Sequence, residues 1–290
     1  MKVRLKNIWL AVSFFLVLFS AQGQCWFDDL RLDLSSNSAT QEFKDFIKTA
    51  DGSLAYKILH TGGKPQLRKS KEALEAVANL RNNPSFSQME LTDAIIGGIQ
   101  GSQNLSYVDV LTTLDNFGNA LQGKNISLIN FERVLSDLNR GANFTEGAEW
   151  TVRYLVNRLN SFSSGKIAFE VTETWNDAGN VIRRVDMIDE TNSASKIYYE
   201  FKSVQNVPPG KFGDQFIKDL SNPDVNSLDQ LKWLFDGRKN PDNFRDNMLD
   251  AIDELNLTED LAEKFTQLRD IEQFRDAIKS EFDEIFELAN

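Results

Sequence analysis

The sequence has only one cysteine, Cys25, and only one histidine, His60, among its 290 residues. A single cysteine cannot form a disulfide within the chain, so the fold must be held together by its core. A nuclease that relies on a histidine and a metal, or a Ser-His-Asp triad, would need His60 as its base. We expect His60 to be a polar loop residue instead, which disfavours both classes of catalytic site.

Long apolar runs are also missing. The apolar stretch over residues 8–19 is shorter than the roughly 20 residues that a membrane-spanning helix needs. It follows three basic residues and precedes a small-residue segment, so residues 1–23 have the pattern of a cleavable secretory signal peptide. We expect a secreted or periplasmic protein with no stable membrane span. Lipid modification of Cys25 is a weaker alternative, because Gln24 stands where such a site favours a small residue.

Positive charge is scarce, with 32 basic against 43 acidic side chains and a net charge of −11. Residues 242–290 alone hold 5 basic and 15 acidic side chains. This balance provides no bulk electrostatic attraction to nucleic acid. We interpret these residues as an acidic helical tail with a solvated outer face. The alternative is that the tail covers an active-site groove until a partner or proteolytic cleavage displaces it.

Helical periodicity dominates the first half of the chain. Apolar residues recur every three or four positions from Tyr107 to Leu121 and again from Leu128 to Leu138. This spacing is typical of amphipathic helices and predicts a helical domain over residues 24–140. On the same helix pattern, we expect Trp150 and Tyr154 to be core residues rather than a base-stacking platform.

The periodicity changes to that of strands after Gly165. Apolar residues alternate over residues 167–171, and residues 181–188 and 196–204 form two further extended runs, with polar turns between the three. The pattern predicts three antiparallel strands in series.

The remaining segments predict more helices and one ambiguous element. Residues 212–220 read as a short helix, and residues 228–235 fit either a helix or a fourth strand. Beyond Pro241 we expect two closing helices. The predicted fold class is therefore α+β, with a domain over residues 141–241 between the helical domain and the acidic tail.

Several charged side chains of the predicted sheet should share one site. Glu200 and Lys202 are two positions apart and point to the same face of the third strand. If both hairpins are symmetric about their turns, Asp186 lies opposite Glu200, and Glu170 lies opposite Asp186. Three opposed carboxylates repel one another. A divalent cation such as Mg²⁺ would offset that repulsion, since it binds oxygen ligands from one or two carboxylates together with water and phosphate.

The spacing of these residues resembles the PD-(D/E)xK nuclease superfamily. Its core runs helix, three strands, helix, strand, with an aspartate on the second strand and Glu-x-Lys on the third. Asp186 and the segment Glu200-Phe201-Lys202 occupy these places, and the resemblance covers roughly residues 146 to 236. Val185 stands where the proline of the motif's name would be, and many members lack that proline.

The resemblance implies a restriction-endonuclease-like core that hydrolyses phosphodiester bonds with Mg²⁺ or Mn²⁺. Asp186 and Glu200 would be the metal ligands, and Lys202 would activate the attacking water or neutralise charge on the phosphate. The row of carboxylates adds Glu170 to the expected site. The superfamily often uses a glutamate of the preceding helix and a nearby glutamine, which implies Glu149, Gln205 and Gln215.

Three further segments are similar to the C-terminal nuclease domains of bacterial polymorphic toxins: residues 146–150, 199–203 and 215–216. We therefore expect an exported nuclease that acts on DNA or RNA. Use as a toxin against competing bacteria would fit export and would imply an immunity protein as a partner. The alternative is a non-catalytic secreted interaction protein built on a nuclease-like scaffold.

Overall fold

The structure is a computed structural model that describes Leu54, Lys57 and residues 67–161, 164–175, 181–191 and 195–289. Residues 76–290 form one compact unit, and residues 1–75 form another, of which few are described. The predicted signal peptide, Cys25 and His60 lie outside the described residues. Within the described ranges, none of the helices combines the length and apolarity that crossing a membrane requires.

The described part of the chain contains ten α-helices and six strands. The α-helices are α4 (Leu67–Asn82), α5 (Asp93–Gly98), α6 (Tyr107–Leu121), α7 (Phe131–Asp137), α8 (Ala142–Arg158), α9 (Phe212–Ser221), α10 (Phe244–Asp253), α11 (Glu259–Thr266), α12 (Ile271–Ser280) and α13 (Phe282–Ile285). The strands are β1 (Asn125–Ile129), β2 (Ser164–Trp175), β3 (Val181–Glu190), β4 (Ile197–Lys202), β5 (Leu231–Asp236) and β6 (Phe286–Ala289).

The six strands form one mixed sheet in the order β1-β2-β3-β4-β5-β6. β2, β3 and β4 are antiparallel neighbours, whereas β1 pairs with β2, β5 with β4 and β6 with β5 in parallel. The predicted series of three antiparallel strands and the helix after it are confirmed, and the ambiguous segment contains a strand, β5. The predicted α+β class is therefore confirmed as a mixed sheet with helices.

Two short strands lie where helices were predicted. β1 pairs with β2 through Leu128 and Ile167, and its burial alternates along the strand, so the expected helix begins only at Phe131. At the other end of the chain, Phe286 begins strand β6 and pairs with Trp233 of β5 instead of continuing a helix. Four helices, α10 to α13, replace the two that were expected beyond Pro241. Apolar residues three or four apart misled here, because short edge strands carry too few residues to show their own period.

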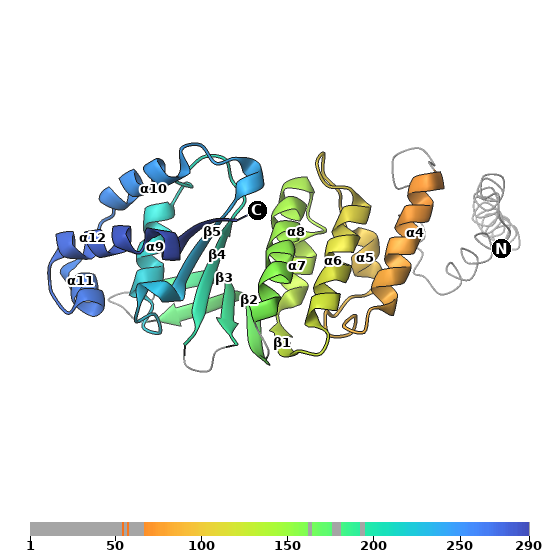
Figure 1. Ribbon diagram of the computed structural model, residues 1–290, viewed down its shortest axis with the longest axis horizontal. Helices are drawn as coiled ribbons and strands as arrows, with labels where there is room; N and C mark the ends of the chain where they lie inside the picture. Colours follow the sequence, from red (N-terminus) through yellow and green to blue (C-terminus); the bar gives the residue numbers. More distant parts are fainter. Residues whose placement is uncertain are drawn as a thin grey trace, which may run out of the picture. The chain divides into compact units, whose positions relative to one another are not determined.

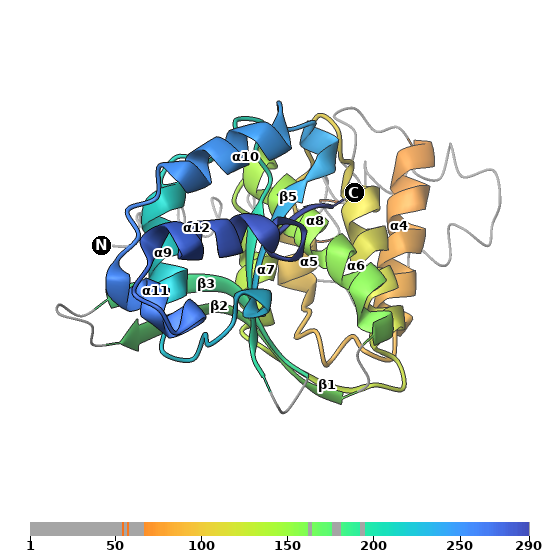
Figure 2. The ribbon, with the colours of Figure 1, turned by 60° about the vertical axis from the view of Figure 1, so that its left-hand side comes forward.

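Helices cover both faces of the sheet. α9, α10 and α12 lie against one face, and α7 and α8 lie against the other (Figures 1 and 2). Trp150 and Tyr154 of α8 pack edge-on against Phe201 of β4, with ring centroids 5.6 and 5.7 Å apart. Both aromatic residues of α8 are buried, so the prediction that they belong to the core is confirmed.

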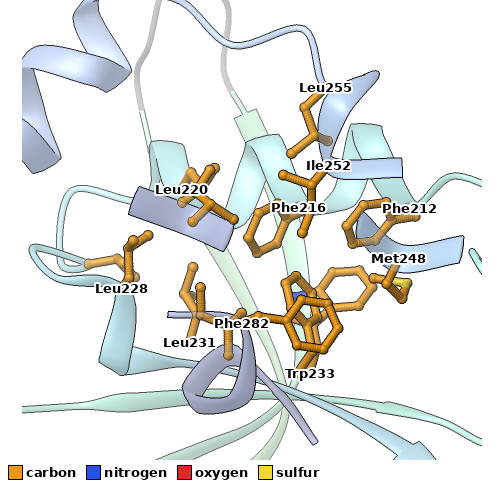
Figure 3. Packing of buried hydrophobic residues seen from close by; sticks show 14 of the residues in the cluster. Phe212, Phe216, Leu220, Leu228, Leu231, Trp233, Met248, Ile252, Leu255 and Phe282 are labelled. Atoms are coloured by element: carbon orange, nitrogen blue, oxygen red, sulfur yellow. The ribbon is translucent and has the colours of Figure 1, made fainter. Parts of the chain in front are cut away.

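An apolar cluster lies between the sheet and α9 to α13 (Figure 3). Phe212 and Phe216 of α9 stack with their centroids 5.4 Å apart, and each meets the ring of Trp233 edge-on. Met248 and Phe282, which belong to the acidic tail (residues 242–290), are also members of the cluster. Burial of each such side chain stabilises the fold by about 1.5–3 kcal/mol.

The inner side of the acidic tail is thus part of the core. All 15 acidic side chains of residues 242–290 are exposed, which confirms the prediction of a solvated outer face. The segment also supplies α10 to α13 and strand β6 of the central sheet. Its removal would expose the apolar cluster, so the segment cannot be separated from the fold.

Candidate active site

The cross-strand register brings the predicted carboxylates together. β3 and β4 pair through Met187 with Tyr199, and continuing this register by one residue sets Asp186 across from Glu200. β2 and β3 pair on either side of Glu170 in the register that sets it opposite Asp186. Both predicted hairpin registers are therefore confirmed.

A cavity of about 460 Å³ lies where these strands meet α8. Four of the residues predicted from the sheet pattern line it, and one residue of α9 joins them: Glu170, Asp186, Glu200, Lys202 and Gln215. They come from three strands and one helix that are up to 45 residues apart in the chain. The sheet therefore gathers the Asp and Glu-x-Lys residues on one wall.

Lys202 is held in place by three neighbours. Its Nζ contacts Glu200 Oε1 in an ion pair and donates a hydrogen bond to Gln215 Oε1 at 3.2 Å. The same nitrogen lies 5.1 Å from the ring centroid of Trp233, within the range of a cation–π interaction. These contacts fix the position of the Lys202 amino group, and a lysine cation there is suited to neutralising negative charge on a phosphate.

Arg183 links the site to α9 and was missed by sequence reasoning. Its Nη2 donates to Glu200 Oε2 at 2.6 Å, and its Nε donates to Asp219 Oδ1 at 2.6 Å. Trp233 Nε1 donates to the other oxygen of Asp219 at 3.1 Å. All four side chains are buried. Burial raises the pKa of Asp219 to about 6, although the hydrogen bond from Arg183 opposes the shift.

A change of face in the β2–β3 ribbon explains why Arg183 was missed. Phe169 packs toward α7, whereas Val171, two positions further, packs against the cluster beside α9. Glu170 between them has φ of 49°, a left-handed conformation that reverses the alternation expected of a strand. On β3, Val185 also packs against the cluster beside α9, and Arg183 reaches Asp219 of that helix.

The sequence did contain one signal for this arginine. Arg183 and Arg184 are adjacent in a strand, and adjacent strand residues point to opposite faces. Because both faces of this sheet are covered by helices, at least one guanidinium had to approach a covered face and find a carboxylate there.

Asp186 lies in an environment that disfavours its charge. Burial and the neighbouring carboxylate of Glu200 raise the pKa of Asp186 to about 8. Lys202 and a 2.9 Å hydrogen bond from the Phe201 amide to Asp186 Oδ2 oppose the shift. Burial also raises the pKa of Glu170, against the pull of Arg184, whose Nε lies 2.9 Å from Glu170 Oε2.

The carboxylates of Asp186 and Glu200 fit the oxygen-ligand chemistry of Mg²⁺ or Mn²⁺. Two such carboxylates, completed by water and substrate phosphate, suffice for Mg²⁺. The carboxylate repulsion that raises the pKa of Asp186 is a cost that a bound cation would remove. The described part of the chain holds no group of three or more His, Cys, Asp or Glu side chains arranged to bind a metal, so the fit rests on this pair.

Two other predicted residues lie elsewhere. Gln205 is exposed in the loop after β4 and is absent from the cavity lining. Glu149 is buried on α8, where it accepts a hydrogen bond from Thr113 at 2.8 Å and pairs with Arg238 at 3.0 Å. The structure therefore brings neither of them to the wall that carries Lys202.

Comparisons with protein-family models, with curated proteins and with solved structures found no match to this chain. Any statement about its activity therefore depends on the geometry of the cavity and on the chemistry of the side chains around it.

Proposed function

We propose that the protein is a metal-dependent nuclease that hydrolyses phosphodiester bonds of DNA or RNA on a restriction-endonuclease-like core. One observation carries the proposal. Asp186 of β3 and both Glu200 and Lys202 of β4 line a single cavity, in the arrangement that the Asp and Glu-x-Lys motif requires. A helix precedes the three strands and another follows them before β5.

Each side chain has a role in this proposal. Asp186 and Glu200 would hold a divalent cation, which when bound would supply charge stabilisation to the phosphate. Lys202, held in position by Glu200 and Gln215, neutralises the charge that develops on the phosphate oxygens. Arg183 positions Glu200 through the 2.6 Å ion pair, although it is not one of the residues of the Asp and Glu-x-Lys motif.

The experiment is a cleavage assay with plasmid DNA and total RNA, run with Mg²⁺, with Mn²⁺ and with a chelator. We expect metal-dependent cutting that Lys202→Ala and Asp186→Asn abolish. Lys218→Ala, which removes an exposed lysine of α9, is the matched control and should retain full activity. Circular dichroism shows whether each variant is folded. Equal cutting by the wild type and the folded Lys202→Ala variant would refute the assigned site.

A non-catalytic scaffold is the second candidate, and one observation favours it. Both oxygens of Glu200 already have partners within the protein, one in Lys202 and the other in Arg183. Such a network can serve structure alone. Titration with Mn²⁺ separates the two candidates, because a scaffold would show no metal affinity and no cutting, whereas the nuclease requires both.

We also propose export through the predicted signal peptide and use as a toxin. The N-terminal charge and apolar pattern supports export, and the similarity to toxin nuclease domains supports the second point. Expression with and without residues 1–23 in bacterial cells tests both. Growth arrest only when the protein remains in the nucleic-acid-containing compartment is the expected result.

A further inference from the structure

An exposed aromatic side chain stands at the candidate active site. Phe144, in the first turn of α8, is 47% exposed and lines the same cavity as Asp186 and Lys202. Five large hydrophobic side chains are exposed among the described residues, and Phe144 is the aromatic one. Single exposed apolar residues are ordinary on protein surfaces, so the position beside the cavity is what gives Phe144 significance.

Arg140 holds the ring of Phe144. The guanidinium carbon of Arg140 lies 4.1 Å from the ring centroid, and its Nη1 donates to Asp137 Oδ1 at 2.9 Å. Asp137 also lines the cavity. The cation–π contact covers one face of the ring and fixes its orientation. An aromatic ring next to a guanidinium plane is a surface on which a nucleobase can stack.

The charge around the cavity disfavours binding through phosphates alone. Its lining has four acidic side chains against three basic ones: Asp137, Glu170, Asp186 and Glu200 against Arg183, Arg184 and Lys202. All three basic groups pair with carboxylates of the lining, Arg183 and Lys202 with Glu200 and Arg184 with Glu170. Duplex binding depends largely on phosphate neutralisation, which this surface and a net charge of −11 do not supply.

We infer that Phe144 and Arg140 form a stacking platform for an unpaired nucleobase, so that the substrate is a single-stranded nucleic acid. The inference rests on the proposed nuclease function and names its substrate class. Stacking requires a base whose face is free, and in a duplex both faces are already stacked. A cavity of about 460 Å³ has the size of a small-molecule site and suits one nucleotide rather than a double helix.

The test is a binding measurement in chelator, where cleavage does not occur. Fluorescence anisotropy is followed with labelled single-stranded DNA, single-stranded RNA and the corresponding duplex. We expect the single strands to bind at least about tenfold more tightly than the duplex. Phe144→Ala and Phe144→Leu should weaken single-strand binding by about 5- to 150-fold, the range for loss of one stacked base. Phe144→Trp should retain it.

Two controls isolate the stacking contribution. Leu268→Ala removes another exposed apolar side chain, far along the chain on the loop after α11, and should bind as the wild type does. A strand with abasic sites keeps its phosphates but lacks bases, so it should bind the wild type and Phe144→Ala equally. The tighter of the DNA and RNA arms identifies the sugar.

Each outcome bears on the inference separately from the nuclease proposal. Binding that depends on Phe144, without cleavage in Mg²⁺ or Mn²⁺, would uphold the platform and refute the hydrolysis. If the wild type cleaves nucleic acid and Phe144→Ala binds and cuts it equally well, the platform is refuted and the nuclease proposal stands. Absence of single-strand binding, or a preference for the duplex, would also overturn the inference.

Discussion

Replacing Asp186 by asparagine should stabilise the protein at alkaline pH. In the folded state, burial and the Glu200 carboxylate raise the pKa of Asp186 to about 8, whereas an unfolded aspartate has a pKa of about 4. Between these values the folded state binds more protons than the unfolded state, so stability falls as pH rises. Asparagine does not titrate, and it retains an oxygen that can accept the hydrogen bond from Phe201.

The size of the effect follows from proton linkage. Each pH unit between the two pKa values costs up to about 1.4 kcal/mol, so a shift of about four units sets an upper limit near 6 kcal/mol. Asp186 is half-buried, and solvent and the nearby ammonium of Lys202 reduce this cost. We expect Asp186→Asn to gain about 2 kcal/mol at pH 8.5, or roughly 4–8 °C in Tm for a domain of this size.

Urea denaturation and thermal melting in chelator at pH 5 and pH 8.5 measure this gain. The stabilisation should be small at pH 5, because the wild-type carboxyl is then mostly protonated in the folded state. Asp276→Asn, an exposed aspartate on α12, is the matched control and should change little at either pH. Destabilisation by Asp186→Asn at pH 8.5 would show that the charged carboxylate is well compensated, and would refute this account.

Three further changes test the packing around the site. Arg183→Met leaves the buried Asp219 without its counter-charge and removes one of the two cations paired with Glu200, so it should cost about 3–5 kcal/mol in urea unfolding; a loss below 1 kcal/mol would contradict the network. Gly165→Ala should cost more than about 2 kcal/mol, since φ is 127° and a Cβ would lie 2.4 Å from Thr191 Cα. Gly210→Ala, with open space around it, is its control and should be near neutral in thermal melting. Phe216→Ala opens the core beside α9 and should cost about 3–5 kcal/mol in urea unfolding; an m-value unchanged from wild type would confirm that only stability changed.

Local pattern was sufficient for the centre of the sheet. The alternation of apolar residues over β2, β3 and β4, with polar turns between them, predicted three antiparallel strands and both hairpin registers. A two-residue period determines which side chains share a face, so Glu200 and Lys202 could be grouped before any tertiary contact was known. The same reasoning grouped Asp186 and Glu170 with them, and both line the cavity.

Local pattern failed where segments distant in the chain meet. β1 and β6 are short, and only their parallel pairing with β2 and β5 makes them strands. Gln205 lies three residues beyond Lys202 but is exposed and does not line the cavity, because the chain has left the sheet by then. Gln215 reaches Lys202 from α9 only through the packing of that helix on the sheet.

The sequence by itself determined the α+β class, the three central strands and the residues that line one wall of the cavity, because these depend on periodicity and spacing. The tertiary structure alone decided that Arg183 turns to bridge Glu200 and Asp219, and that Phe144 is left exposed beside the cavity. The first depends on a left-handed residue, Glu170, that reverses the faces of a strand. The second depends on how α8 packs, which no local pattern encodes.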